Sequence, residues 1–484
     1  MPSFRLRAAA LILCVGPQPV LAQEPAVLAD SVAAAVDRLF APFAHSGSPG
    51  CAVGVFQDGR VAFARGYGFA NLNYDVPITP ATTFTVGSVS KQFTAASIAL
   101  LVGAGRLSLD DDLRRFVPEL PAWASLVKVR HLVHHTSGTR DFWELVDLAG
   151  MRPDDGYQVS DMLALTARQQ GLNFPPGSAY RYSNTGYLLL GLIVQRVSGQ
   201  TLRAFADSAI FRPLGMRDTR FLDDHNEVVP RRAVAYSPSG GKYRINVWNN
   251  DLVGQGGIVT SLADLQKWDE NFYDPGVGGV GFPAMMRSLD PLRDGGPNNY
   301  AFGLTLSQYR HLRLEEHTGA TGGYRAALFR LPEIHSSVAL LCNHSAVNTT
   351  ALAQRVADVA FGDRLRMPPE FSGERAVAAV RATVAAGPFF NREALIGAYR
   401  SDELLGAEWI VAADTGGGLV VLLPRHAPMR FRATGPNTFA AVTELALEET
   451  GVLLTFDAAV RGRAPGFVVT GDRVSGVRFA RQSP

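Results

Sequence analysis

Alternating apolar and polar positions predict antiparallel strands in the first part of the chain. The apolar run 51–57 and the segment 60–67 flank Asp58-Gly59, a pair that accepts the positive φ angles of a tight hairpin turn. Three further apolar runs of strand length lie at 312–317, 324–331 and 336–342. The pattern therefore predicts a sheet whose strands come from both ends of the region 51–342.

Helical spacing of apolar residues occurs around and between these strands. Hydrophobic residues recur at intervals of three and four from residue 90 to 107, and Gly103 and Gly105 mark the end of that pattern. A second helix is predicted over 349–361. The stretch 109–217 mixes helical patterns with Pro and Gly loops, which predicts a helical subdomain inserted into the sheet-containing one.

The pattern changes after Gly362. A linker and a short helix are predicted over 366–390. Short apolar runs separated by turn residues follow, at 409–413, 419–423, 429–432, 452–456, 466–470 and 473–481. This spacing is typical of an antiparallel β-barrel or sandwich. We therefore expect one α+β domain at 30–365 and an all-β domain at 391–484.

Composition agrees with two folded domains. The chain has 484 residues, a length that exceeds what one hydrophobic core usually organises. Of these residues 47% are hydrophobic and 19% are charged. The formal net charge is +2, and no run of Lys or Arg could follow a phosphate backbone. Nucleic acid is therefore not expected as a partner.

The first 22 residues have the pattern of a secretory signal peptide. Arg5 and Arg7 precede an apolar stretch, and small residues lead to a cleavage site after Ala22. Cys14 could mark a lipoprotein, but Leu13 is too bulky for the position before a lipidated cysteine. No later segment is long and apolar enough for a membrane span. We expect a periplasmic or secreted protein.

Two cysteines remain after the signal peptide, Cys51 and Cys342, each in a predicted strand. An oxidising compartment would permit a disulfide between them. Two separate buried thiols are an equal alternative, because free cysteines are often buried.

Three copies of Ser-x-x-Lys offer a candidate nucleophile, and their context separates them. Ser88 and Lys91 lie at the start of the apolar helix, where residues three apart share one face. Burial would lower the pKa of Lys91, so that a neutral amine could accept the Ser88 proton. Ser125 precedes the strand-like run 127–129, and Ser239 lies in a Gly-rich turn. We interpret those two copies as chance matches.

Two further short motifs could complete such a site. In Tyr182-Ser183-Asn184, a phenol near a lysine could move a proton and the Asn184 amide could bind a substrate carbonyl. In His317-Thr318-Gly319, the glycine would let a substrate approach the strand, and the N–H of Ala320 could join that of Ser88 as an oxyanion hole. Taken alone, each motif is more often an ordinary loop or strand end.

The order Ser-x-x-Lys, Tyr-x-Asn, His-Thr-Gly resembles the serine β-lactamase-related hydrolases of the class C type, which include D-aminopeptidases, carboxypeptidases and esterases. The resemblance covers about 52–361 and includes the stretches 87–94, 129–138 and 256–264. It implies an antiparallel sheet flanked by helices, a helical lobe, and a cleft between them.

The resemblance also implies roles for particular residues. Ser88 would be the nucleophile, and Lys91 and Tyr182 the proton-transfer pair. The residues implied to bind substrate are Asn184, His317, Gly319 and Ala320. No metal or organic cofactor is implied, and the grouped histidines 131, 134 and 135 lack a zinc signature.

One departure bears on the substrate. Class C β-lactamases carry a lysine where this chain has His317, and a mostly neutral histidine would be a weaker, pH-dependent anchor for a carboxylate. We therefore expect hydrolysis of small esters or of short peptides, including peptides that contain D-residues. The alternatives are a true β-lactamase and an acylated sensor that does not turn over. The C-terminal domain could bind a ligand, restrict access or mediate oligomerisation.

Overall fold

The structure, a computed structural model, describes residues 27–152, 154–365, 392–414, 416–442 and 449–482. The predicted signal peptide at 1–22 and the predicted linker and helix at 366–390 lie outside the described residues.

A six-stranded antiparallel sheet forms the centre of the first domain, in the order β10-β11-β12-β13-β1-β2. The strands are β10 (Thr305–Tyr309), β11 (Leu312–Thr321), β12 (Tyr324–Leu331), β13 (Ser336–Cys342), β1 (Cys51–Gln57) and β2 (Arg60–Tyr67). Asp58 and Gly59 have φ angles of 48° and 76° at the β1–β2 turn, which confirms the predicted hairpin. The sheet therefore does join strands from both ends of the domain.

Cys51 and Cys342 lie opposite each other on β1 and β13 and form a disulfide. Of the two alternatives that the sequence left open, the structure contains the cross-link. It joins neighbouring strands that are 291 residues apart in the sequence.

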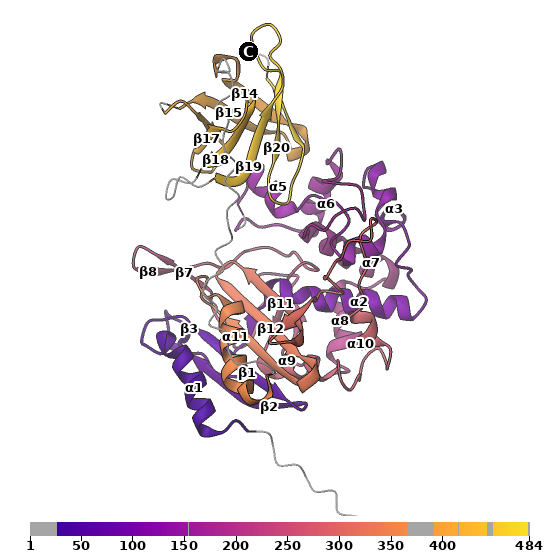
Figure 1. Cartoon of the computed structure of the whole chain (residues 1–484), viewed down its shortest axis with the longest axis vertical. Coiled ribbons are helices and arrows are strands. Elements are labelled where there is room, and N and C mark those ends of the chain that lie inside the picture. The colour runs from indigo at the N-terminus through magenta and orange to yellow at the C-terminus, as the bar shows by residue number, and fades with distance from the viewer. Residues whose placement is uncertain (1–26, 153, 366–391, 415, 443–448, 483–484) are drawn as a thin grey trace, which may run out of the picture.

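Helices cover both faces of the sheet (Figure 1). On one face α1 (Asp30–Phe40) packs beside α11 (Thr349–Phe361), whose bounds match the predicted helix. On the other face lies α9 (Leu262–Glu270), which contacts β1, β2 and β13. The sheet is thus buried on both faces.

The helical lobe begins with α2 (Lys91–Gly103), which continues a 3₁₀ turn at Gly87–Ser90. The longest helix of the described residues, α7 (Asn184–Ser198), begins where the Ser183 hydroxyl accepts from the Gly186 N–H. It ends at Gly199, whose φ is 78°. The other helices are α3 (Leu113–Phe116), α4 (Val129–Val133), α5 (Phe142–Leu148), α6 (Val159–Ala167), α8 (Leu202–Ala206) and α10 (Phe282–Met286). The strand suggested at 127–129 is wrong, because α4 begins at Val129.

Three small sheets accompany the central sheet. They are β3 (Phe69–Asn71) with β4 (Val76–Pro77), β5 (Phe84–Thr85) and β6 (Arg220–Phe221) with β9 (Ile258–Thr260), and β7 (Tyr236–Ser239) with β8 (Lys242–Ile245).

The C-terminal part is a closed eight-stranded barrel, as the sequence predicted. Its strands are β14 (Gly397–Ser401), β15 (Ala407–Ala413), β16 (Leu419–Leu422), β17 (Met429–Ala433), β18 (Thr438–Val442), β19 (Glu449–Phe456), β20 (Gly466–Thr470) and β21 (Val477–Arg481). The strand predicted from residue 473 begins at Val477, so 471–476 form a loop.

The barrel lies beside α5 of the helical lobe (Figure 1), and the two parts share one apolar core. Trp409 of β15 is fully buried, and its indole N–H donates to the Leu148 carbonyl at the end of α5 at 2.9 Å. The barrel is therefore packed against the lobe.

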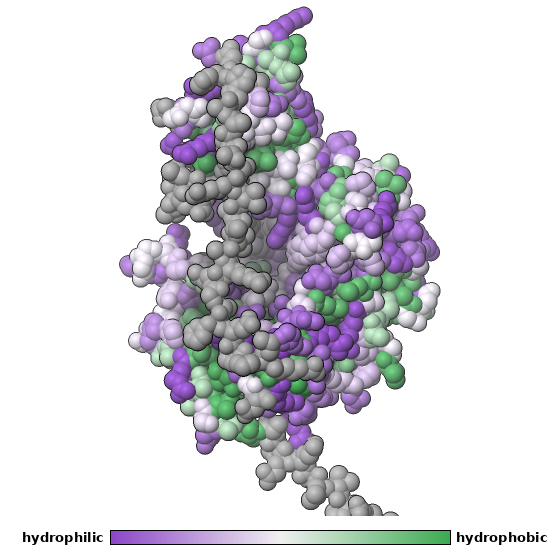
Figure 2. Space-filling view, viewed as in Figure 1, coloured by the Kyte–Doolittle hydropathy of each residue, from purple (hydrophilic) through white to green (hydrophobic). Residues whose placement is uncertain are grey.

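On the described part of the face in Figure 2, hydrophilic and hydrophobic residues are mixed over the helical lobe. Among the helices that the structure describes, none has the length and apolar character needed to cross a bilayer.

Candidate active site

The 3₁₀ turn before α2 presents Ser88 to a cleft between the sheet and the lobe. Gly87 has a φ of 50°, and a Cβ there would collide with the backbone of Ala320 on β11. A Cβ on Gly319 would likewise collide with the carbonyl oxygen of Val86. Both glycines therefore allow the nucleophile turn to pack directly against β11.

Lys91 has a fully buried side chain, and its Nζ lies 3.1 Å from the Ser88 Oγ. Burial lowers the pKa of Lys91 well below its ordinary value. Its amine also lies 2.9 Å from Asn184 Oδ1 and 2.6 Å from the Gln255 carbonyl oxygen. Because these two oxygens can only accept, a neutral amine would donate to both and keep its lone pair for the Ser88 hydroxyl.

Tyr182 closes the other side of the nucleophile. Its hydroxyl is hydrogen-bonded to Ser88, and its ring centroid lies 4.7 Å from the Lys91 Nζ. Burial raises the pKa of Tyr182, so the phenol keeps its proton at neutral pH. The three side chains predicted to cooperate are thus brought together at the start of α2.

Asp141 is a buried member of the site that sequence reasoning missed. Its Oδ2 accepts from the Asn184 backbone N–H at 2.6 Å and from the Asn184 side-chain amide at 2.9 Å. Since a carboxylate only accepts, this contact turns the Asn184 Oδ1 toward Lys91. Asp141 therefore fixes the orientation of the amide that holds the lysine.

His317 lies in the wall of the cleft with both ring nitrogens engaged. Nδ1 is 2.6 Å from the Thr318 carbonyl oxygen, which can only accept, so the Nδ1–H donates there. Nε2 is 2.8 Å from the Tyr300 hydroxyl and accepts a hydrogen bond from it. Burial lowers the pKa of His317 to about 3. A ring with so low a pKa is neutral near pH 7, which argues against the pH-dependent anchor expected from the sequence. The role of His317 in substrate binding stays a prediction.

The cleft has a volume of about 730 Å³, within the range of small-molecule sites. Ser88, Tyr182, Asn184, His317, Gly319 and Ala320 line it. Trp143 and Trp248, with ring centroids 4.8 Å apart, add an aromatic wall. All the predicted site residues except the buried Lys91 therefore face one opening, and their proposed roles stay predictions.

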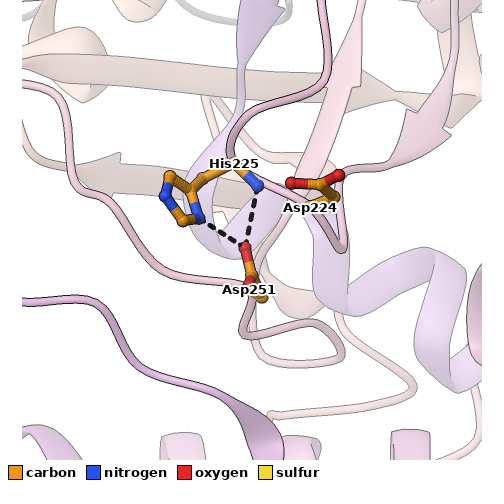
Figure 3. A group of neighbouring side chains, drawn as sticks. All are labelled: Asp224, His225 and Asp251. Carbon is orange, nitrogen blue, oxygen red and sulfur yellow. Dashed lines mark hydrogen bonds and ion pairs between the residues drawn. The ribbon is translucent and has the colours of Figure 1, made fainter.

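His225 lines this cleft and forms a cluster with Asp224 and Asp251 behind it (Figure 3). Asp251 Oδ1 accepts from both the backbone N–H and the Nδ1 of His225, each at 2.8 Å. These contacts engage the backbone N–H and Nδ1 of His225 and connect two loops, and the cluster gives no independent sign of a metal.

The grouped histidines have structural places. His131 Nδ1 accepts from the Lys128 N–H, and His134 Nδ1 donates to the Tyr300 carbonyl. His135 is buried against Tyr182, with ring centroids 4.2 Å apart. These contacts support the loops around the site, and among the described residues the three rings do not form a group that could hold one metal ion.

Comparison with known proteins adds the family. The family model described as Beta-lactamase matches residues 36–361. The D-aminopeptidase of Gluconobacter oxydans is 31% identical over 333 residues, and that of Cereibacter sphaeroides is 30% identical over 317 residues. The alignments span 67% and 64% of this chain but only 61% and 59% of those relatives.

Solved structures share the fold. The octameric penicillin-binding protein homologue from Pyrococcus abyssi aligns with a TM-score of 0.62 at 22% identity, over 93% of this chain and 99% of that one. The D-amino acid amidase from Ochrobactrum anthropi aligns with a TM-score of 0.58 at 24% identity, over 69% of this chain and 99% of that one. The fold class predicted from the sequence is confirmed.

The family match spans most of the first domain and contains every residue of the predicted site. The expectation that the chain is related to β-lactamases is confirmed at this level. The chain belongs to the Beta-lactamase family.

Proposed function

We propose that this protein is a serine hydrolase that forms an acyl-enzyme on Ser88. Its substrates are short peptides, including peptides that contain D-residues, or small esters. The observation that carries the proposal is the buried Lys91 amine, 3.1 Å from the Ser88 Oγ, with a lowered pKa. D-aminopeptidase relatives support amide substrates.

Acylation begins with the proton of Ser88. Neutral Lys91 accepts it as Oγ attacks the substrate carbonyl carbon, and the tetrahedral intermediate carries negative charge on the former carbonyl oxygen. The backbone N–H groups of Ser88 and Ala320 would donate to that oxygen, and the tight packing of the Gly87 turn on β11 favours this arrangement.

Collapse of the intermediate requires a proton on the leaving nitrogen or oxygen. Tyr182, hydrogen-bonded to Ser88 and protonated at neutral pH, is placed to give that proton and recover one from Lys91. Water then attacks the acyl-enzyme by the reverse proton path and releases the acid. No step needs a metal or an organic cofactor.

A true β-lactamase is the second candidate, favoured by the family itself. The neutral His317 offers no charge to the carboxylate of a β-lactam, so this chain lacks the cation that class C β-lactamases carry at that position. Repeated nitrocefin turnover would favour the β-lactamase. A sensor that is acylated only once would give a single burst of product.

The test compares ester and amide turnover in matched serine variants. Wild type is expected to hydrolyse 4-nitrophenyl acetate and at least one of the N-acetylated dipeptides N-acetyl-D-alanyl-glycine and N-acetyl-L-alanyl-glycine. Ser88→Ala should abolish both activities, whereas Ser239→Ala, in the exposed third Ser-x-x-Lys copy, should retain them. Full activity in Ser88→Ala would overturn the proposal.

We also propose that the protein acts in the periplasm or outside the cell. The disulfide between Cys51 and Cys342 supports this, because such bonds persist in oxidising compartments. Fractionation of cells that express the full chain tests the location, and its mass in solution tests assembly through the barrel. Retention of the uncleaved chain in the cytoplasm would contradict the proposed location.

A further inference from the structure

The charged side chains that line the cleft are unbalanced. The described lining residues include three arginines and no aspartate or glutamate; the arginines are Arg232, Arg325 and Arg473. An open cleft with one sign of charge attracts ligands of the other sign. The three arginines differ, however, in what they contact.

Two of the arginines are engaged with the domain that holds them. Arg325 Nη1 donates to the carbonyls of Gly322 and Tyr324 at 2.9 and 2.7 Å. Arg232 Nη2 lies 3.5 Å from the Thr85 Oγ1. Their positions are therefore set by neighbouring protein atoms.

Arg473 comes from the barrel, on the loop 471–476 that joins β20 to β21. Its backbone N–H donates to Glu144 Oε2 at 2.6 Å. Its carbonyl accepts from the Asn173 side chain at 2.9 Å and from the Asp141 N–H at 3.3 Å. The helical lobe thus holds the main chain of Arg473 on both sides.

The side chain of Arg473 extends from this fixed backbone toward the nucleophile. Its guanidinium carbon lies 5.2 Å from the centroid of the Tyr182 ring, the residue whose hydroxyl contacts Ser88. Arg473 is exposed, and among the described residues no carboxylate forms an ion pair with it. A guanidinium in the cleft is therefore open to a ligand.

We propose that Arg473 is a specificity residue that binds a carboxylate of the substrate, so that the barrel completes the catalytic cleft. The inference rests on the proposed function and names its substrate class: amides or esters that carry a free carboxylate close to the scissile bond. A planar guanidinium binds a carboxylate through two parallel hydrogen bonds. A substrate with a free ammonium group would instead be repelled by the arginines, because the described lining residues include no acidic residue that could bind it.

The experiment measures inhibition of Ser88-dependent 4-nitrophenyl acetate turnover by matched ligands. Both enantiomers of N-acetylphenylalanine are compared with their carboxamides, which have the same shape and no charge. For wild type, the better acid enantiomer should bind about 10- to 100-fold more tightly than its amide, the range of a hydrogen-bonded charge pair. The acid-to-amide ratio is taken within each variant, so it does not depend on the basal rate.

Variants then assign the preference. Arg473→Gln should bring the ratio close to one, and Arg473→Lys should keep part of it. Arg432→Gln, an exposed arginine on β17 outside the cleft, is the matched control and should keep the full ratio. Thermal unfolding and fluorophosphonate labelling of Ser88 check that each variant is folded.

The outcomes separate the two proposals. If ester turnover in wild type does not depend on Ser88, the proposed function has failed, and this inference with it. If turnover depends on Ser88 but wild type does not prefer the acids, the inference alone is overturned, even if Arg473→Gln cannot be prepared. A preference that survives in Arg473→Gln also overturns it.

Discussion

Arg140 of the helical lobe donates to Glu403 of the barrel at 2.6 Å, and only 5% and 6% of the two side chains are exposed. The same Arg140 donates through Nη2 to the Gly476 carbonyl, in the loop that carries Arg473. This buried ion pair therefore fixes the barrel at the point where its loop enters the cleft.

Replacing Glu403 by Gln is expected to destabilise the protein strongly. The change leaves the Arg140 guanidinium buried without its counter-charge, which costs about 3–5 kcal/mol of unfolding free energy. Denaturation in urea measures the loss. Asp155→Asn is the control, because Arg425 and Asp155 bridge the same two parts in an exposed pair, worth less than about 1 kcal/mol. Equal effects of the two variants would contradict the role of the buried pair.

Removing the Tyr182 hydroxyl is expected to reduce turnover while the fold is preserved. Tyr182→Phe should lower kcat by about 10²- to 10⁴-fold, the range for loss of a positioned proton-transfer group. Steady-state ester kinetics measure the effect. Tyr180→Phe alters a neighbouring, more exposed ring that is 44% accessible and should change kcat less than about threefold. A fully active Tyr182→Phe would remove the tyrosine from the mechanism.

The lowered pKa of Lys91 predicts a particular dependence of stability on pH. Between that lowered pKa and about 10.4, the unfolded chain binds a proton at Lys91 that the folded chain does not. This group therefore makes the folded state more stable as pH rises, by at most about 1.4 kcal/mol per pH unit. Lys91→Met removes the effect, so the difference in unfolding free energy, wild type minus variant, should increase with pH.

Urea denaturation between about pH 6 and 9 measures that slope. Lys128→Met is the matched control, since Lys128 belongs to the second Ser-x-x-Lys copy and its side chain is 42% exposed. The control should show no comparable increase. If the difference in unfolding free energy between wild type and Lys91→Met does not change with pH, the Lys91 amine is charged in the folded protein.

His317 is expected to stay neutral throughout the working range. Its pKa of about 3 lies far below neutral pH, so no change in rate between pH 5 and 8 should come from this ring. The pH profile of kcat/KM in His317→Gln should keep the wild-type shape even if the rates fall. Loss of an inflection near pH 6–7 in that variant would contradict the neutral, doubly bonded ring.

Local patterns predicted the elements that depend on neighbours in sequence. The Asp58-Gly59 turn and the helix 349–361 follow from turn chemistry and periodicity alone, and both occur as expected. The pairing of Ser88 with Lys91 could also be predicted, because one helical turn brings the two side chains together.

Other parts depend on contacts between distant segments. Asp141 orients Asn184 from 43 residues away, and nothing in its local sequence marks it as part of the site. Arg473 was placed in a predicted strand, yet it lies in a loop held by Glu144 and Asn173 of the lobe. Such residues become visible only when the packing of barrel against lobe is known.

The central claim concerns the reactivity of one hydroxyl, and peptide mapping by mass spectrometry after fluorophosphonate treatment tests it most directly. A single adduct on Ser88 is predicted, formed much more slowly in Lys91→Met because the amine that accepts its proton is gone. Labelling of another serine at the same rate, with Ser88 unmodified, would contradict the account.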